Sequence, residues 1–230
     1  MKISTRFAIA VALCALPAAA AFAQDAPAGP PAAAPTCELH LWPAERMMSR
    51  TSGLLGGMGV IGALADTAAH ANRDATNRTQ LASALDSPSQ LDALQSLNLL
   101  TELNLPAGTA VVRHEAPLER HTMNRIKTRR SDSTATCYYE LITADVLYMR
   151  SPIYGRSLRT LFMLRAFGND QSIDFEYKAW GGNGLSHFPP REGEDVTVAI
   201  QELVDVFKRN FQEYANNERQ AAARRAGGRR

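Results

Sequence analysis

Apolar residues recur with helical spacing near the end of the chain. Between Asp195 and Tyr214 most of them stand three or four residues apart, which is the period of an amphipathic helix with one buried face. The acidic pair Glu194 and Asp195 precedes this run, where negative charge favours the start of a helix. The pattern predicts a helix over 195–214 with an apolar stripe of Val196, Ile200, Leu203, Val204, Phe207, Phe211 and Tyr214.

Five shorter segments alternate between apolar and polar residues in the manner of β-strands. The clearest is 173–180, in which Phe175 and Tyr177 face one way and the charged Glu176 and Lys178 face the other. The remaining strand-like segments are 37–42, 109–114, 138–149 and 158–167. Within 138–149 we expect one shared face for Tyr138, Ile142, Ala144, Val146 and Tyr148.

A second helix is expected from Ser87 onward. Ser87 can cap it, Pro88 suits the first helical position, and Gln90 can complete a capping box. The order of elements is then strand, helices, strand, three-strand meander and long helix. This order predicts an α+β fold with a mixed, mainly antiparallel sheet of about five strands, covered on one face by helices that include the long C-terminal one.

The first 23 residues have the features of a cleavable export signal. Lys2 and Arg6 precede an apolar core over 7–16, and Ala21-Phe22-Ala23 supplies a small-x-small cleavage site. We therefore expect a periplasmic or secreted protein, cleaved near Ala23. The expected organisation is a signal peptide over 1–23, a Pro/Ala-rich linker over 24–36, one α+β domain over 37–219, and an Arg-rich tail without regular structure over 220–230.

Cleavage would leave two cysteines, Cys37 and Cys137. Exported thiols are commonly oxidised, so the even number favours a disulfide between them over two separate buried thiols. The loop that it closes spans most of the domain.

Basic residues are concentrated in two places, the 120–133 segment and the tail. The first is expected to be an exposed loop, while Arg224 and Arg225 in the tail are candidates for contact with an acidic surface. Residues 125–130 contain no aromatic side chain that could stack on a base. Together with export, this argues against nucleic acid as a partner.

The chain lacks the usual catalytic and metal-binding motifs, so we expect no catalytic centre, metal or cofactor. His40 and His114 would meet if the first two strands pair. The one segment with some catalytic character is the glycine-rich 181–187, expected to be a loop whose backbone N–H groups could bind an anion. An alternative hypothesis, an exported hydrolase or small-ligand binder, places its site there at Gly182, Asn183, Ser186 and His187.

A second glycine-rich segment runs from Gly53 to Ala65. Gly53 and Gly57 are spaced for close helix approach, and Met58 lies among several apolar neighbours. This segment could contact a partner or enter a membrane surface, or it could be a buried connection of small residues.

Three parts of the pattern carry a family resemblance. Ala144-Asp145-Val146-Leu147 opens the meander, 161–167 forms its second strand and 196–211 forms the closing helix. Over roughly 37–214 this order resembles the periplasmic α/β domain of outer-membrane assembly lipoproteins of the curli-secretion type and the N-terminal domain of the Tol β-propeller protein. The chain is also similar to uncharacterised exported bacterial envelope proteins. The lipid-bearing cysteine of the assembly lipoproteins is missing here.

These observations favour an exported, non-catalytic envelope protein that acts by contact with a protein or a membrane surface. A homo-oligomer is also compatible with the pattern. The identity of the partner does not follow from the sequence, since a fold resemblance does not transfer function.

Overall fold

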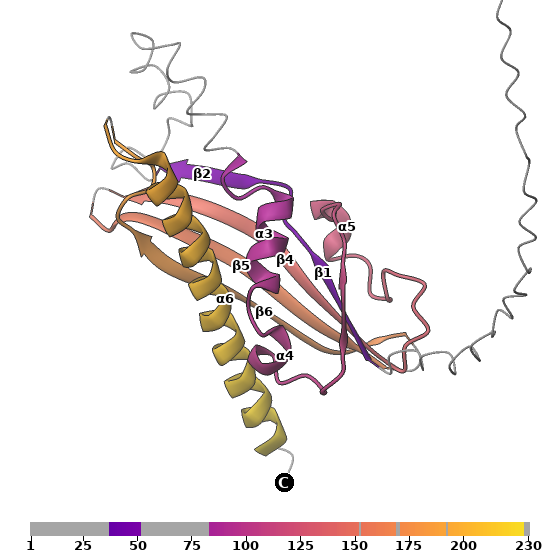
Figure 1. Ribbon diagram of the computed structural model, residues 1–230. Helices are drawn as coiled ribbons and strands as arrows, with labels where there is room; N and C mark the ends of the chain where they lie inside the picture. The colour runs from indigo at the N-terminus through magenta and orange to yellow at the C-terminus, as the bar shows by residue number, and fades with distance from the viewer. Residues whose placement is uncertain (1–36, 52–82, 152, 169–170, 192, 228–230) are drawn as a thin grey trace, which may run out of the picture. The chain divides into compact units, whose positions relative to one another are not determined.

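Strand β4 is the centre of a six-stranded sheet (Figure 1). On one side it pairs with β5, which pairs with β6, and these three form the predicted antiparallel meander. On the other side β1 and then β2 follow one another along β4, both parallel to it, and β3 pairs in parallel with β1. The strands are β1 (Cys37–Trp42), β2 (Met47–Thr51), β3 (Ala110–Arg113), β4 (Cys137–Ser151), β5 (Gly155–Phe167) and β6 (Ile173–Leu185).

The computed structural model describes residues 37–51, 83–151, 153–168, 171–191 and 193–227. The expected signal peptide, the linker and the glycine-rich segment with Gly53, Gly57 and Met58 lie outside these ranges and remain predictions.

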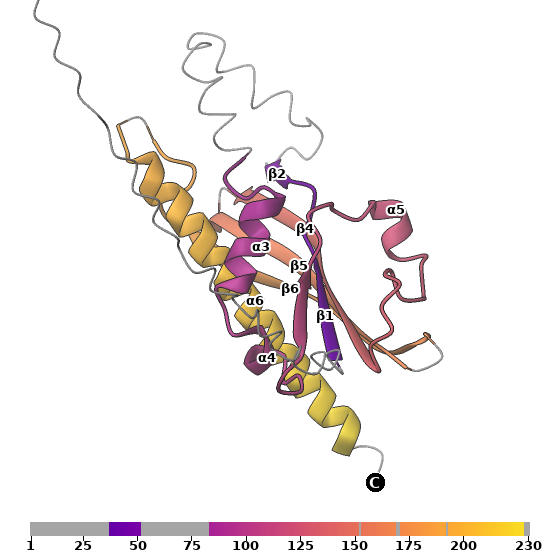
Figure 2. The ribbon, with the colours of Figure 1, turned by 45° about the vertical axis from the view of Figure 1, so that its right-hand side comes forward.

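Helices lie on both faces of the sheet, but very unequally (Figures 1 and 2). Three of them, α3, α4 and α6, cover one face and enclose the main hydrophobic core with it. Among the helices in the described part of the chain, only the short α5 lies on the other face, where Met123 joins a smaller apolar cluster around Trp42. This confirms the α+β prediction, with β2 as a sixth strand that the sequence pattern had not indicated. The helices are α3 (Ser87–Gln95), α4 (Leu99–Glu102), α5 (Arg120–Met123) and α6 (Val196–Gly227).

The stripe predicted on the long helix packs as expected. Phe162 of β5 lies among three aromatic rings of α6, with ring-centroid distances of 5.6 Å to Phe207, 5.3 Å to Phe211 and 5.4 Å to Tyr214. All four side chains are fully buried. Burial of each such side chain is worth roughly 1.5–3 kcal/mol, so this contact holds α6 on the sheet.

The prediction that 220–230 lacks regular structure is wrong for residues 220–227, because α6 continues to Gly227. Alanine and arginine are strong helix formers, and this segment consists almost entirely of them. The extension also has contacts of its own, since the Arg225 guanidinium lies 5.1 Å from the centre of the Phe175 ring on β6.

A second expectation fails at a β-bulge in β4. The register with β5 shifts between Thr143 and Asp145. An extra residue in one strand reverses which side chains face which side beyond it. Ile142 and Ala144 therefore join the cluster around Trp42, whereas Val146 and Tyr148 join the core under α6. The five residues expected on one face are divided between two.

Helix α3 begins at Ser87 as expected, but its cap differs. The side chain of Asp86, not Ser87, accepts the N–H of Ser89 at 2.9 Å. Gln90 does not complete a capping box: it is fully buried and bonds both the N–H (2.8 Å) and the carbonyl (3.1 Å) of Ala44. It thereby ties α3 to the connection between β1 and β2.

Candidate functional site

The most unusual part of the molecule is a row of polar and aromatic side chains on the sheet face opposite α6. Alternation along β1 places Glu38, His40 and Trp42 on that face, and the buried Leu39 and Leu41 on the other. His114, directly after β3, lies next to Trp42, and in the parallel register β4 adds Tyr138 and Glu140. We call these side chains the buried row: Glu38, His40, Trp42, His114, Tyr138 and Glu140.

His40 is the centre of this row and is only 3% exposed. Its Nε2 lies 2.9 Å from a carboxylate oxygen of Glu38, and its Nδ1 lies 2.8 Å from Nε2 of His114. A carboxylate accepts only, so neutral His40 donates from Nε2 to Glu38 and accepts at Nδ1 from His114. One tautomer of each ring satisfies both contacts. The predicted meeting of His40 and His114 is thus confirmed.

Stacking adds to these hydrogen bonds. The rings of Trp42 and His114 are parallel within 2° and their centroids are 4.1 Å apart. Tyr138 lies 4.5 Å from the His40 ring. Burial lowers the pKa of both histidines, and for His114 the neighbouring His40 lowers it further. The geometry therefore favours neutral rings near pH 7.

Ser133 completes the polar chain, but in an order that does not activate a nucleophile. Its hydroxyl donates to the carboxylate of Glu38, which in turn accepts from His40. The Ser133 hydrogen bond, followed by that of His40, lowers the pKa of Glu38. In hydrolytic triads the histidine stands between the hydroxyl and the acid. Here the acid stands between the hydroxyl and the histidine.

Buried charges continue from Glu140, a member of the buried row, to Arg130 and Arg165. Nε of Arg130 lies 3.3 Å from the fully buried carboxylate of Glu140, and the backbone N–H of Arg130 donates to it at 3.0 Å. Arg165, also fully buried, donates to Glu176 at 2.8 Å. Burial raises the pKa of Glu140 and lowers that of Arg130. Each charge is thus held against an opposite one.

The segment expected to be an exposed basic loop over 120–133 supplies part of this set, so that expectation is wrong in two respects. Residues 120–123 form α5, and the Arg130 side chain is buried against Glu140. The segment also covers the middle of the sheet, because the carbonyl of Ile126 accepts from Arg165 at 3.1 Å. The sheet face under this segment carries the buried Glu140 and Arg165. The segment supplies a hydrogen-bonding or charged group to each, which offsets the cost of burying those charges.

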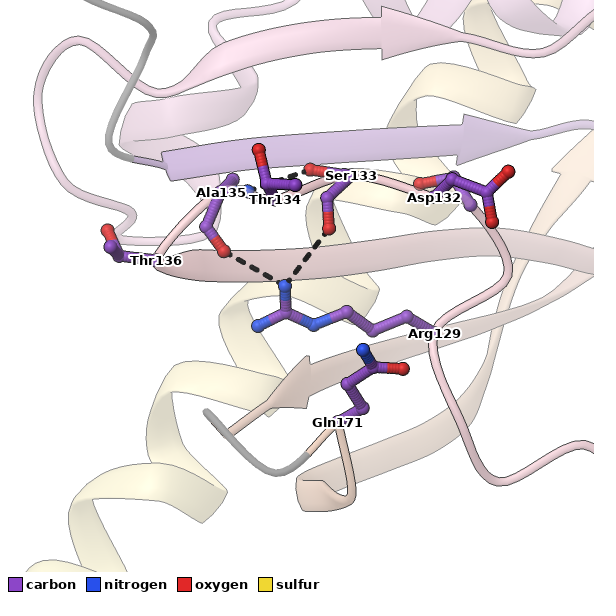
Figure 3. Close-up of a pocket in the computed structure, with 8 residues that line it drawn as sticks. Arg129, Asp132, Ser133, Thr134, Ala135, Thr136 and Gln171 are labelled. Carbon is purple, nitrogen blue, oxygen red and sulfur yellow. Dashed lines mark hydrogen bonds between the residues drawn. The ribbon is translucent and has the colours of Figure 1, made fainter.

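A cavity of about 500 Å³ opens next to Ser133 (Figure 3). Its wall is mostly hydroxyl and amide groups, with one cation, Arg129. That guanidinium donates to the carbonyls of Ala135 at 2.9 Å and Gly168 at 3.2 Å and lies over the Tyr138 ring. Arg129 thus holds the loop onto the sheet. The lining residues are Arg129, Ser131, Asp132, Ser133, Thr134, Ala135, Thr136 and Gln171.

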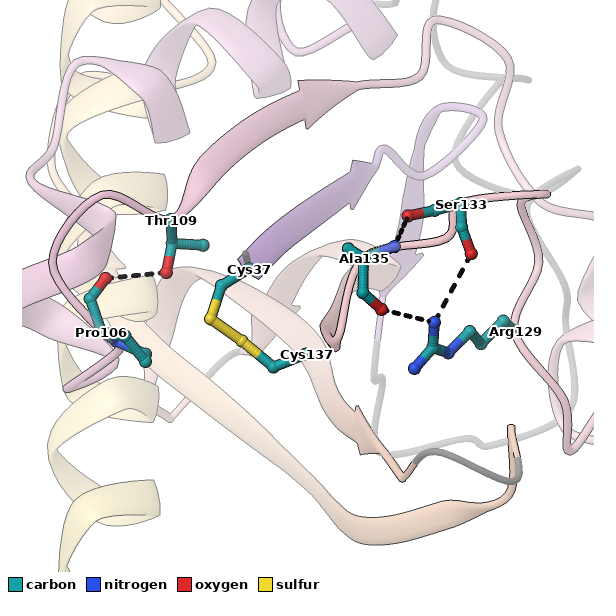
Figure 4. The surroundings of a disulfide bond; sticks show 7 residues. All are labelled: Cys37, Pro106, Thr109, Arg129, Ser133, Ala135 and Cys137. Atoms are coloured by element: carbon teal, nitrogen blue, oxygen red, sulfur yellow. Dashed lines mark hydrogen bonds between the residues drawn. A yellow bond between two sulfur atoms is a disulfide. The ribbon is translucent and has the colours of Figure 1, made fainter. Parts of the chain in front are cut away.

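The predicted disulfide lies close to this cavity (Figure 4). Cys37 and Cys137 are paired at the first position of the β1–β4 register, with their Cα atoms 4.5 Å apart. The bridge therefore fixes the two strands that carry Glu38, His40 and Tyr138.

The alternative ligand loop of the sequence analysis has a different structure. Gly182 and Asn183 belong to β6, which continues to Leu185. The N–H groups that follow do bind an anion, but that anion is the carboxylate of Glu202. The backbone N–H groups of Ser186, His187 and Phe188 donate to it at 2.6, 2.7 and 2.9 Å. This carboxylate occupies the position that an external anion would need, so the structure does not support a site there.

Glycine at 181 serves packing. A Cβ atom added at Gly181 would lie 2.2 Å from the carbonyl oxygen of Asn210 on α6. Asn210 is buried and bonds to the carbonyl of Leu158 at 2.9 Å and to the side chain of Asn183 at 2.8 Å. The helix and the sheet thus lie close together at this segment, with no room for a side chain at position 181.

The structure adds an exposed feature that the sequence analysis missed. At the tip of the β4–β5 hairpin, Ile153 is 77% and Tyr154 is 87% exposed. The hydroxyl of Ser151 accepts from the backbone N–H of each, at 3.4 and 3.3 Å. The only sequence signal was two bulky apolar residues directly after Ser151-Pro152 in a turn. Arg224 and Arg225 lie elsewhere, near the end of α6.

Within the residues that the structure describes, no helix is long and apolar enough to span a membrane. The same residues hold no group of three or more His, Cys, Asp or Glu side chains suited to a metal ion.

No family model matches this chain, and no curated protein matches it in sequence. Among solved structures it is similar to a candidate lipoprotein of Caulobacter crescentus, with 16% identity and a TM-score of 0.29 over 43% of this chain and 73% of that one. A DUF330 protein of Xanthomonas campestris gives 10% identity and a TM-score of 0.38 over 79% and 80% of the two chains. A hypothetical protein of Chlamydia trachomatis gives 10% and 0.33 over 79% and 95%. Likeness at this level establishes neither family nor function, and the curli-secretion and Tol resemblance stays a prediction.

Proposed function

We propose that this chain is an exported, non-catalytic protein of the cell envelope that binds a partner protein through the tip of its β4–β5 hairpin. The observation that carries the proposal is the exposure of Ile153 and Tyr154 side by side at that tip. Export rests on the sequence features of residues 1–23.

The tip is prepared for binding in its free state. Strands of 15 and 13 residues support it, Ser151 bonds to its backbone, and Gly155 adopts a positive φ of 72° that closes the turn. Little conformational entropy is then lost when a partner binds. Tyrosine is also enriched among the residues that dominate binding energy in protein interfaces.

A protein partner fits this end of the domain better than a lipid surface does. Arg156 at the base of the hairpin donates to the carbonyl of Pro189 at 2.9 Å, and α6 begins near the same end of the sheet (Figure 1). Arg150 and Arg156 are paired in the strand register beside the tip, whereas the exposed Glu194 and Asp195 precede α6, so this end lacks the purely basic cluster that attracts anionic lipids. Two apolar side chains also provide little area for insertion.

The non-catalytic part of the proposal is supported by the state of the buried row. Glu38, His40 and His114 bond to one another, and Glu140 is held by Arg130. The hydroxyl that bonds to Glu38, that of Ser133, donates to a carboxylate instead of to an imidazole. These contacts stabilise the fold, and they occupy the side chains that would otherwise be available to act on a substrate.

Site-specific photo-cross-linking in cells tests the proposal. A photoreactive residue in place of Tyr154 should give a cross-link to one envelope protein, or to a second copy of this chain. The same photoreactive residue in place of Ile126, which is 39% exposed on the side of the sheet opposite α6, should give no cross-link to that protein. A matching pattern at both positions, or lipid adducts alone, would contradict the proposal.

Mutation provides a second readout. The double variant Ile153→Ser/Tyr154→Ser should weaken capture of that partner by about 2 kcal/mol or more, the scale of interface hot spots. Val111→Ser, at an exposed apolar position on β3, should leave capture unchanged.

A further inference from the structure

A second cavity, of about 440 Å³, lies on the other side of the sheet between α4 and the C-terminal half of α6. Both views of the ribbon place these two helices side by side there (Figures 1 and 2). Its floor is the helix-facing side of β4 and β5, formed by Tyr139, Leu164 and Ala166. Leu103 and Leu105, which follow α4, form one wall.

The space exists because small residues line it. Ala166 on the sheet and Ala222 and Ala223 on the helix stand where longer side chains would fill the gap. Arg219 connects α6 to α4 beside the opening of the cavity. It donates to the carbonyl of Glu102 and lies 3.5 Å from its carboxylate. The charge of Arg219 is thus directed to α4.

One acidic side chain lines this largely apolar cavity, in which Asn104 and Arg219 are the other polar side chains apart from the Tyr139 hydroxyl. Glu218 is only 6% exposed and lines the cavity, yet among the described residues no hydrogen bond or ion pair holds its carboxyl group. Burial raises its pKa, while the neighbouring Arg219 and Arg225 lower it in part. A buried carboxyl without a partner is costly, and a bound group that satisfies it recovers that cost.

We infer that this cavity binds an alkylammonium group, with the ammonium against the Glu218 carboxylate and the alkyl chain against Leu103, Leu105 and Leu164. The volume lies in the range of small-ligand sites, which combine an apolar lining with few polar groups. An anionic head is disfavoured because Arg219 is already paired with Glu102. An amphiphile with an amine head and a lysine-like side chain of a peptide share this chemistry.

Calorimetric titration of the purified chain with octylamine, octanol and octanoate tests the inference. Octylamine should bind, and octanoate should bind at least about tenfold more weakly. In Glu218→Gln the affinity for octylamine should fall about tenfold or more, while that for octanol should change little. Two further titrations, with butylamine and with a lysine-containing peptide, distinguish the two sources of the ammonium group. An amphiphile site should bind octylamine more tightly than butylamine, because affinity then rises with chain length, whereas a site for a lysine side chain should bind the peptide and show no such rise.

Two control variants separate the head and chain contributions. Ala222→Leu should fill the cavity and abolish binding of octylamine without loss of helical content. Glu115→Gln, an exposed carboxylate outside the cavity, should bind octylamine like the unmodified chain. The inference is overturned if octylamine does not bind, if octanoate binds equally well, or if Glu218→Gln leaves the affinity for octylamine unchanged.

Discussion

His114 donates from its Nε2 to Nδ1 of His40 across 2.8 Å, although 74 residues separate the two in sequence. The parallel pairing of β1 and β3 brings them together, and Glu38 fixes the tautomer of His40 from the other side. Two imidazoles joined in this way share their hydrogen bond only while His40 keeps a free acceptor nitrogen. Protonation of His40 at Nδ1 removes that acceptor and breaks the arrangement.

Stability should therefore fall as the pH drops below about 6.5, the ordinary histidine pKa. Both folded-state pKa values are lowered, so the unfolded chain binds more protons in the window below 6.5, and stability rises with pH there. The stabilisation is fully present above that window. Urea unfolding from pH 7.5 to 5 should show it, with at most about 1.4 kcal/mol per pH unit for each proton involved.

The matched variants for this effect are His114→Gln and His121→Gln. The first keeps an N–H donor toward His40 but removes one titrating ring, so the slope of stability against pH should decrease. His121 lies exposed beside Glu119 and outside the buried row, so its replacement serves as the control. Equal slopes for all three chains would refute the assignment.

Replacing Gly181 by alanine should destabilise the fold by about 1–3 kcal/mol, the usual range for overpacking. The added Cβ would lie 2.2 Å from a backbone oxygen of Asn210, so α6 must move away from the sheet. In Gly182→Ala the nearest atom is 3.5 Å away on the flexible side chain of Arg159, and the change should be within about 0.5 kcal/mol. Thermal unfolding of the two variants makes the comparison.

Removal of the disulfide should cost on the order of 4–5 kcal/mol of unfolding free energy, because the bridge closes a loop with a sequence separation of 100. Urea unfolding with and without a reductant measures the difference. The double variant Cys37→Ser/Cys137→Ser should match the reduced chain and should not respond to the reductant. A reductant effect that persists in this variant would place its cause elsewhere.

Glu202→Gln should weaken the attachment of the 186–188 segment to α6. Burial opposes ionisation of Glu202, but the N–H groups of Ser186, His187 and Phe188 outweigh it and lower the pKa. The stabilisation is present above pH 4.5 and is lost as the pH falls through the folded-state pKa. We expect a loss of about 1–3 kcal/mol at pH 7 that shrinks toward pH 3.

Glu213→Gln is the control for that variant. Glu213 is exposed and accepts one backbone N–H, that of Gly182, at 3.0 Å. Its loss should be clearly smaller at pH 7. Hydrogen exchange of the 186–188 amides should accelerate only in Glu202→Gln, and protection that survives there would contradict the role given to Glu202.

Short-range pattern was sufficient for much of the fold. The spacing of Leu203, Phe207 and Phe211 predicted the α6 stripe, and the alternation around Tyr177 predicted β6, because burial on one face leaves a periodic trace. The strand β2 left no such trace: it has five residues and follows β1 along the same edge of β4. The bulge after Thr143 was also invisible, since an extra residue in one strand is defined only by its partner.

By itself, then, the sequence determined the fold class, the main helix and the pairing of Cys37 with Cys137, all of which depend on local period or on an even count of cysteines. Tertiary structure alone decided the rest. It placed the Glu202 carboxylate at the expected anion loop, buried Arg130 against Glu140, and exposed Tyr154 at the hairpin tip. It also buried Glu218 with no hydrogen bond or ion pair to its carboxyl group among the described residues. Those properties depend on what approaches a side chain from distant parts of the chain, and local periodicity carries no information about that.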